Sequence, residues 1–125
     1  MSAPSDRLYS STHEWHKKDG EIVTIGLTRF AVDALTDVTY VEMKPAGTAV
    51  KPGETVGEVE SVKTTSDVYS AVSGQITQVN EDLEGNPGLL NEDPYAHWLV
   101  KVRASDLSGL SRCVDAATYE REHAV

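Results

Sequence analysis

Basic residues are scarce in this chain of 125 residues. It contains 11 lysines and arginines against 20 aspartates and glutamates, which gives a formal net charge of −9 at neutral pH. A negative surface of this kind repels nucleic-acid phosphates and anionic membranes at long range. The composition therefore argues against nucleic acid or a membrane surface as the partner.

Cysteine and long apolar runs are also rare. The one cysteine, Cys113, cannot form an internal disulfide, which is typical of a reducing compartment. We interpret it as a small apolar residue on a helix. No run approaches the roughly 18 apolar residues that span a bilayer, and the opening residues lack the apolar segment of a secretory signal. We expect a soluble, intracellular protein.

Aromatic residues make up only 6% of the chain, so the core has to be built mainly from aliphatic side chains. Hydrophobic residues account for 39% in total. At this length they suffice for one modest core but hardly for two. We therefore predict one compact domain.

The first part of the chain shows strand, helix and turn patterns in succession. Apolar residues recur at every second position in residues 20–27, which predicts a strand with one buried face. Thr28 suits the N-cap of a short helix that ends at Thr36 and carries Ala34 on its apolar side. Residues 37–43 have a β-type composition, and prolines and glycines then divide the chain into turns.

Valines placed symmetrically about Thr65 predict a β-hairpin. Val62 and Val68 lie three residues to either side of it, and a second apolar pair lies six residues away. We place the chain reversal within residues 63–67. The two arms of this hairpin form at most a weak mirrored repeat.

The second half continues with strands and a final helix. We predict a strand over residues 74–80 and a loop over residues 81–95, whose glycines and prolines forbid a long helix. Another strand is expected around Val100, and a helix is expected after it. The predicted buried stripe of that helix is Leu107, Leu110, Val114 and Ala117.

Many short strands separated by glycine and proline turns predict a mainly β fold. We expect a flattened β-sandwich or barrel with a short internal helix and a C-terminal helix. The pattern gives no sign of a linker or a low-complexity segment.

Motifs for catalysis or metal binding are not evident. The segment HEWH, residues 13–16, places its histidines three apart, whereas the zinc helix motif needs a spacing of four. We predict a structural role for it and no metal site. The chain has neither a recognisable nucleophile turn nor a phosphate-binding glycine loop. Its many carboxylates are mostly expected to be solvated. These patterns therefore give no candidate catalytic residue.

Lys63 is the residue whose setting suggests a function. It lies at the predicted reversal within GEVESVKTTSDVYSAVSG, residues 57–74, among small hydroxyl residues. A tight turn directs one side chain outward, and small neighbours leave room for an approaching enzyme. We interpret Lys63 as a displayed lysine, the alternative being an ordinary surface lysine.

The stretch ESVKTTSDVYSAVSG resembles the modification loop of the glycine cleavage system H protein family, whose lysine in the ESVK element carries lipoate. The resemblance extends to LYSSTHEW, TIGLTRFAVDALTDVTYVEM, GTAVKPGE and VNEDLEGNPGLLNEDPY. It covers about residues 8–119 and implies a single lipoyl-carrier domain over residues 1–125, with the flattened lipoyl and biotinyl type of fold. The chain departs from the family pattern at Phe30, at Thr36, where the family has glycine, and in the short PYAHWLV segment.

The resemblance implies a non-catalytic carrier of the aminomethyl group of glycine. Its implied partners are a pyridoxal-phosphate glycine decarboxylase (P protein), an aminomethyltransferase (T protein) and dihydrolipoyl dehydrogenase (L protein), which reoxidises the dithiol. A lipoate ligase or a lipoyl/octanoyltransferase would attach the lipoate, because an exposed lysine amine is mostly protonated and needs an activated acyl group. The implied location is the bacterial cytoplasm, or the mitochondrial matrix if a transit peptide has been removed. The alternatives are an H-like lipoate relay, another swinging-arm carrier, and a plain β interaction module.

The same resemblance assigns the site residues. Lys63 corresponds to the lysine that bears lipoate in an amide linkage. Biotin carriers usually display lysine between methionines, so its neighbours here favour lipoate. The residues expected to be recognised by the attaching enzyme are Glu60, Ser61, Val62 and Asp67. Glu14 and Asp67 are expected to hold the ammonium group of the loaded arm, the alternative being that both are ordinary solvated acids.

Overall fold

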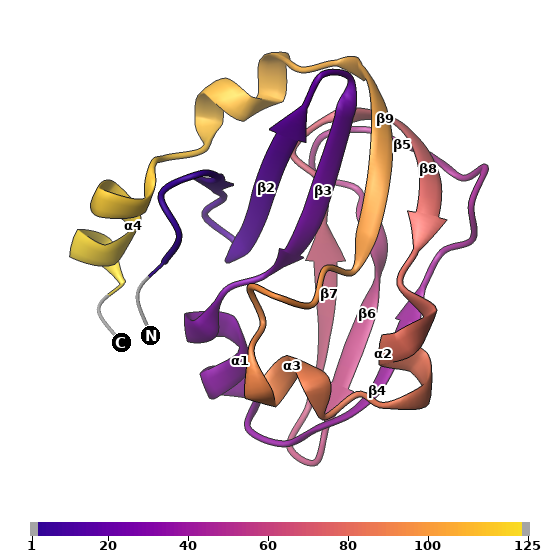
Figure 1. Ribbon diagram of the computed structural model, residues 1–125, viewed down its shortest axis with the longest axis vertical. Coiled ribbons are helices and arrows are strands. Elements are labelled where there is room, and N and C mark those ends of the chain that lie inside the picture. Colours follow the sequence, from indigo (N-terminus) through magenta and orange to yellow (C-terminus); the bar gives the residue numbers. More distant parts are fainter. Residues whose placement is uncertain (1–2, 124–125) are drawn as a thin grey trace.

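Two antiparallel β-sheets form most of the computed structural model, which describes residues 3–123 (Figure 1). The larger sheet has the strand order β1-β2-β3-β9-β8-β5, and the smaller sheet has the order β4-β6-β7. The strands of the larger sheet are β1 (Leu8–Tyr9), β2 (Glu14–Asp19), β3 (Ile22–Leu27), β9 (Val100–Asp106), β8 (Ser73–Val79) and β5 (Ala49–Val50). Those of the smaller sheet are β4 (Val38–Met43), β6 (Thr55–Ser61) and β7 (Thr65–Tyr69).

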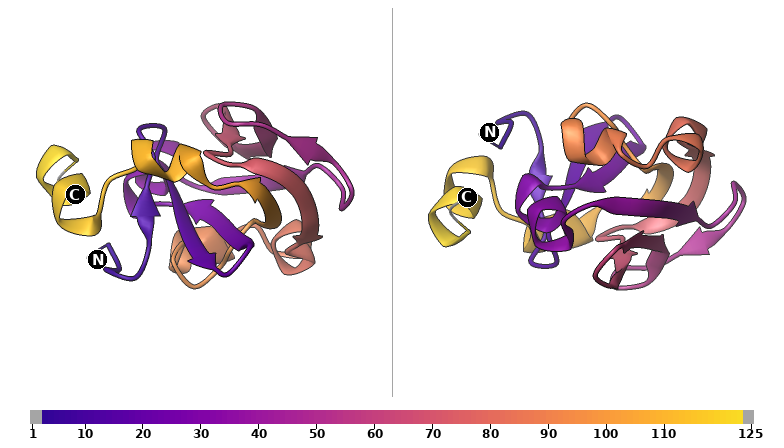
Figure 2. Two further views of the ribbon diagram at one scale, coloured as in Figure 1. Left: turned by 90° about the horizontal axis from the view of Figure 1, so that it is seen from above. Right: turned by 90° about the horizontal axis from the view of Figure 1, so that it is seen from below.

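Short helices connect and flank the strands. They are α1 (Arg29–Leu35), α2 (Glu81–Gly85), α3 (Leu89–Glu92), a 3-10 helix (Ser108–Arg112) and α4 (Ala116–Glu122). Helices α1 and α3 lie side by side near the tip of the β6–β7 hairpin (Figure 1). Figure 2 shows α4 at one end of the molecule, beside the N-terminal segment. Among the described residues, no helix has the length and apolar character needed to cross a membrane.

The main core lies between the two sheets. The larger sheet contributes Ile25, Ile76 and Val102, and the smaller sheet contributes Val41 and Val59, all of them almost completely buried. A second cluster of Tyr9, Trp15, Ala116 and Tyr119 fixes α4 against the first strands. The prediction of a mainly β, two-layered fold is therefore confirmed, and over residues 3–123 neither sheet closes into a barrel.

The first helix begins and ends as the sequence predicts. The Thr28 hydroxyl accepts a hydrogen bond from the Ala31 amide at 3.2 Å and caps α1. Its apolar side was predicted wrongly at one position, because Ala34 is exposed and Val32 is buried.

The position of the hairpin reversal was also predicted wrongly. The register pairs Glu60 with Thr65 and Val59 with Ser66, so the hairpin is centred between Val62 and Lys63 and not on Thr65. Val62 is not a buried strand residue, since 71% of it is exposed at the turn. The spacing of valines was misleading because Gly57, not a valine, pairs with Val68.

Several predictions for the C-terminal half also need correction. Residues 81–95 are not only loop, because they contain the short helices α2 and α3. The helix expected after β9 is interrupted, since the Asp115 carboxylate accepts from the Thr118 amide at 2.8 Å and starts α4 there. Ala117 is exposed, and the buried residues of α4 are Ala116 and Tyr119. Cys113 follows the 3-10 helix, half-buried, and does not lie on a helix.

His16 is expected to make the stability of the fold fall in mild acid. Its ring is 1% exposed, and Nε2 accepts from the Ala71 amide at 3.1 Å, so Nδ1 carries the proton of the neutral ring. Burial lowers the pKa of His16 to about 4, and a contact with the Glu14 backbone offsets this only in part. Between pH 6.5 and pH 4 the unfolded chain therefore binds a proton that the folded chain does not. The free energy of unfolding should fall by up to about 3 kcal/mol over this range.

Urea unfolding of the wild type and of His16→Gln at pH 7, 6, 5 and 4.5 measures this contribution. Glutamine keeps an acceptor for the Ala71 amide but does not titrate. The difference in unfolding free energy between the two proteins isolates His16 from the other ionisable groups. We expect that difference to change with pH, and two parallel curves would contradict the assignment.

Candidate functional site

Lys63 lies at the tip of the β6–β7 hairpin with its side chain in solvent. The Ser61 hydroxyl holds the backbone of this turn. Its Oγ accepts from the Lys63 amide at 3.1 Å and from the Thr64 amide at 3.0 Å, and it donates to the Thr64 carbonyl at 3.1 Å. Serine and threonine hydroxyls commonly stabilise turns in this way. The turn thus presents the lysine from a backbone with a defined conformation.

The turn is also attached to the rest of the smaller sheet. The Val62 amide donates to the Asp37 carbonyl at 3.1 Å, which ties the tip to the residue before β4. The Val62 side chain and Tyr40, which is 43% exposed, are the exposed large hydrophobic residues of the described chain. Of the residues predicted to be recognised with Lys63, Ser61 and Val62 therefore belong to the turn itself.

The outer face of the smaller sheet is acidic. Cross-strand pairs place Glu42 opposite Glu58 and Glu58 opposite Asp67, so three carboxylates form a row across three strands. Glu60 lies two residues after Glu58 on the same strand, nearer to the turn, and it pairs with Tyr40 on one side and Thr65 on the other. Like charges in directly opposite positions destabilise a sheet. The row therefore favours contact with a positively charged surface.

Glu14 is a buried carboxylate at the start of β2. It is 1% exposed. Its Oε1 accepts from the hydroxyls of Ser10, at 2.6 Å, and Thr12, and its Oε2 accepts from the Tyr69 amide at 3.1 Å. Burial raises the pKa of Glu14, while these hydrogen bonds act in the opposite direction. The alternative that Glu14 is an ordinary solvated acid is therefore wrong.

Glu14 lines a pocket of about 310 Å³, which we call the Glu14 pocket. Polar wall residues are Ser10, Thr12 and Ser70, and the 3-10 helix contributes Gly109 and Arg112. Gly109 allows this helix to approach closely, since a Cβ there would lie 1.7 Å from the Ala71 carbonyl oxygen. A small pocket with a buried carboxylate in its wall can hold an ammonium group.

Strand β7 connects Lys63 to the Glu14 pocket. It begins at Thr65, beside the turn, and ends at Tyr69, whose amide contacts Glu14. Four residue steps at about 3.3 Å give a span of about 13 Å. An acyl arm of about ten single bonds has a length on the order of 10–15 Å. Because Lys63 lies two residues before β7, the path from its Cα to Tyr69 is about 20 Å. An arm laid along β7 therefore covers most of the distance to the pocket.

The structure does not bring Glu14 and Asp67 into one pocket. Asp67 is exposed in the middle of β7 and lines a separate groove with Glu42 and Glu58. It lies on the strand that the arm would follow, between the turn and the pocket.

Sequence reasoning missed Ser10, Thr12 and Tyr69 as the partners of Glu14. The only local signal was the run of hydroxyl residues SST before HEW. The contact with Tyr69 joins residues 55 positions apart and has no signal in a single sequence.

The two histidines of HEWH make structural contacts. His13 Nδ1 lies 2.8 Å from the Tyr119 hydroxyl, and that hydroxyl lies 2.7 Å from the Thr28 hydroxyl. His13 and His123 also surround Phe30 in an aromatic cluster. Across residues 3–123, no group of three histidine, cysteine or acidic side chains is arranged to hold a metal ion.

Thr36, one of the departures noted in the sequence, has a positive φ of 66°. This conformation costs a non-glycine residue about 1–3 kcal/mol. The departure therefore affects the backbone at the end of α1 and not the lysine turn.

Comparison with known proteins gives consistent matches over nearly the whole chain. The model of the family "Glycine cleavage H-protein" matches residues 7–124. The chain is 46% identical over 121 residues to a glycine cleavage system H protein of Thermus thermophilus, covering 96% of this chain and 94% of the relative. It is 43% identical over 121 residues to the H protein of Bacillus subtilis, covering 96% and 95%. The crystal structure of an H protein from Mycobacterium marinum superposes with a TM-score of 0.89 at 35% identity, covering 98% of this chain and 100% of the other.

Proposed function

The chain belongs to the glycine cleavage H-protein family, and we propose that lipoate is attached to its Lys63 through an amide bond. Membership makes it a non-catalytic lipoyl carrier of the glycine cleavage system. The main structural support for Lys63 as the attachment site is its turn. The Ser61 hydroxyl fixes the backbone there, and the lysine side chain extends into solvent. Residues 1–125 act as one carrier domain.

The loaded arm is proposed to lie along β7 with its aminomethyl group in the Glu14 pocket. An arm attached to Lys63 extends along most of β7 towards the pocket, and Glu14 supplies a buried carboxylate for the ammonium. Asp67 contacts the arm on its way to the pocket. Shielding the aminomethyl group from water slows its loss between two enzymes.

The proposed partners are the glycine decarboxylase, the aminomethyltransferase, dihydrolipoyl dehydrogenase and a lipoate ligase or lipoyl/octanoyltransferase. The acidic row of Glu42, Glu58 and Asp67, with Glu60 beside it, supports partner surfaces that are basic. Tethering the arm to the carrier gives each partner a high local concentration of it. The curated relatives named above are bacterial, and we propose the cytoplasm as the location.

Lipoylation followed by peptide mapping tests the attachment site. The protein is incubated with a lipoate ligase, ATP and lipoate, and the modified residue is identified by mass spectrometry. We expect one lipoyl group, on Lys63. Lipoate on Lys51 or another lysine, or an unmodified Lys63 after treatment with an active ligase, would refute the proposal.

Replacing Glu14 with glutamine should shorten the lifetime of the aminomethyl-loaded carrier. The substitution keeps the size of the side chain and one oxygen that can accept from the Tyr69 amide, but it removes the charge that holds the ammonium group. A charge-assisted hydrogen bond of about 1.5–3 kcal/mol corresponds to a lifetime that is roughly tenfold shorter or more. Release of formaldehyde from the isolated loaded carrier measures this lifetime.

Two further variants separate the pocket from general charge effects. Asp67→Asn should shorten the lifetime less, because Asp67 is exposed and lies outside the pocket. Glu21→Gln removes one charge from an exposed turn and should leave the lifetime unchanged. Equal lifetimes in the wild type, Glu14→Gln and Asp67→Asn would show that neither carboxylate holds the arm.

A further inference from the structure

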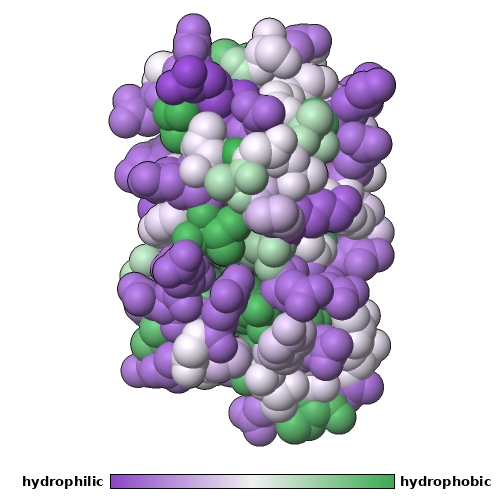
Figure 3. Space-filling model, turned by 90° about the vertical axis from the view of Figure 1, so that its right-hand side faces the viewer, coloured by the Kyte–Doolittle hydropathy of each residue, from purple (hydrophilic) through white to green (hydrophobic). Residues whose placement is uncertain are grey.

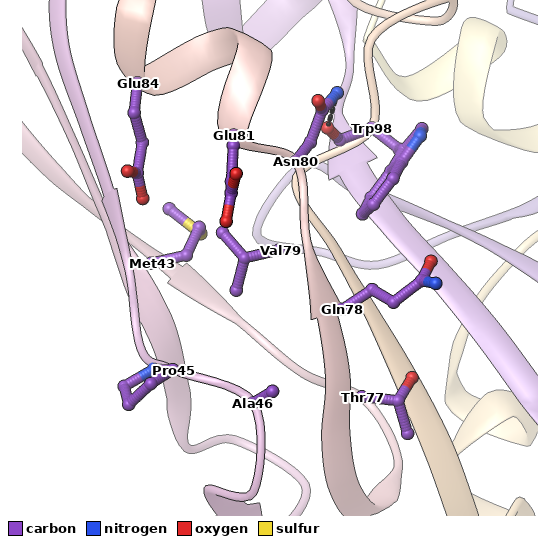
Figure 4. Close-up of a pocket in the computed structure, with 10 residues that line it drawn as sticks. All are labelled: Met43, Pro45, Ala46, Thr77, Gln78, Val79, Asn80, Glu81, Glu84 and Trp98. Atoms are coloured by element: carbon purple, nitrogen blue, oxygen red, sulfur yellow. Dashed lines mark hydrogen bonds between the residues drawn. The ribbon is translucent and has the colours of Figure 1, made fainter.

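A second hollow, which we call the edge groove, lies where the two sheets meet α2. It has a volume of about 640 Å³ and is lined by the end of β4 and the residues after it, the end of β8, α2 and Trp98 (Figure 4). On the side of the molecule formed by β8, α2 and β4, hydrophobic side chains show between hydrophilic ones (Figure 3). None of its lining residues belongs to the Glu14 pocket.

Both sheets expose an edge at this groove. Strand β4 is the outermost strand of the smaller sheet. In the larger sheet, β5 pairs with β8 only at Gly74 and Gln75, and Ile76 extends this contact through hydrogen bonds with residues 47 and 48. Beyond Ile76, β8 pairs with β9 and with no other strand among residues 3–123. A free strand edge presents unpaired amides and carbonyls, to which an extended peptide can add as a further strand.

Two carboxylates give the groove negative charge. Glu81 and Glu84 extend into it from α2 (Figure 4). Neither takes part in the three ion pairs found among residues 3–123. Asp82, on the same helix, does not line the groove. Two unpaired carboxylates beside a free strand edge favour a positively charged occupant.

The remaining wall suits an arginine side chain in particular. Trp98 is partly exposed, and the side chains of Met43 and Val79 lie between it and the β4 side (Figure 4). A guanidinium group stacks on an aromatic ring while it hydrogen-bonds to carboxylates, and its methylene groups pack on apolar surface. The chain itself places a cation at this ring, since the Nζ of Lys101 lies 5.0 Å from the Trp98 ring centroid.

We propose that the edge groove is a docking site for an extended, arginine-bearing segment of a partner protein. The segment adds to the free edge of β8, and its arginine lies over Trp98 and Val79 with the guanidinium facing Glu81 and Glu84. Since the groove shares no residue with the Lys63 turn or the Glu14 pocket, the segment leaves both open. The proposal does not depend on the attachment of lipoate.

A nuclear magnetic resonance titration tests the site with a defined probe. The probe is an acetylated and amidated hexapeptide in which valine and arginine alternate, added to the isotope-labelled full chain at low salt. We expect saturable shifts of the Thr77–Glu81 amides and of the Trp98 indole. The combined substitution Glu81→Gln/Glu84→Gln should weaken binding roughly fivefold, as for the loss of two partly exposed ion pairs.

Matched controls decide between docking and general attraction. Asp82→Asn removes one charge from the same helix outside the groove and should change the affinity less than twofold. A peptide that is N-methylated on alternate residues keeps its charge but cannot pair along a strand edge, and should bind at least fivefold more weakly. Shifts confined to other regions, equal weakening by Asp82→Asn, or unaltered binding of the methylated peptide would each overturn the proposal.

Discussion

Lys63→Arg should abolish lipoate attachment while leaving the fold intact. Arginine keeps the positive charge and the length of the side chain, but its guanidinium stays protonated and does not form the amide. The Lys63 side chain is in solvent and belongs to none of the ion pairs among residues 3–123. The free energy of unfolding should therefore change by less than about 0.5 kcal/mol. Intact-mass measurement after ligase treatment should find no lipoylated protein.

The functional consequence should be equally large. Without the arm, the aminomethyl group has no attachment point, so glycine cleavage in a reconstituted system should fall to the background without carrier. Lys51→Arg is the matched control, because Lys51 is also exposed in a turn, and it should keep full modification. A lipoylated Lys63→Arg protein, or one that supports glycine cleavage, would show that the arm is carried elsewhere.

Local features of the site were predictable from the sequence. The reversal near Lys63 is built by residues within three positions of it, and the Ser61 hydroxyl makes its turn-stabilising bonds within that range. The Thr28 cap of α1 is local in the same sense. Interactions of this range depend on residue type and spacing, which a single sequence contains.

The register of the hairpin was less predictable because it depends on pairing between strands. Valines mark buried positions, yet the buried position opposite Val68 is filled by Gly57. A Cβ on Gly57 would lie 2.5 Å from the Glu42 carbonyl oxygen, so the neighbouring strand requires glycine there. The close approach of the neighbouring strand therefore explains why glycine, and not valine, lies opposite Val68.

The burial of Glu14 was not predictable from one sequence. Carboxylates are usually exposed, and nothing within β2 distinguishes Glu14 from the other acids. Its burial follows from the contact of β2 with Tyr69 and from the 3-10 helix that closes the same pocket. These contacts join segments far apart in the chain, so only the folded structure identifies the pocket.

Exchanging Lys63 and Thr64 should nearly abolish modification without changing composition or net charge. In the double substitution Lys63→Thr/Thr64→Lys, the Ser61 hydroxyl still binds the amides of positions 63 and 64. The backbone of the turn is therefore retained. Successive side chains in an extended backbone point in different directions, so the lysine leaves the tip at a different angle. We expect lipoylation by a ligase to be at least 100-fold slower than in the wild type.

The exchange separates two ways in which an enzyme recognises this lysine. Both positions are exposed, so the free energy of unfolding should change by only a fraction of a kcal/mol, and urea unfolding verifies this. Thr64→Ser, which keeps Lys63 in place, is the control and should be modified at the wild-type rate.

The rate of modification shows which feature the ligase recognises. If the ligase recognises a flexible local sequence, the exchanged protein is modified almost as fast as the wild type. If the ligase recognises a lysine held by the Ser61 turn, the amine at position 64 is misplaced for the enzyme, although the composition of the chain is unchanged. A wild-type rate in the exchanged protein would therefore refute the role of the turn, while attachment to Lys63 in the natural sequence would still be tested separately by Lys63→Arg.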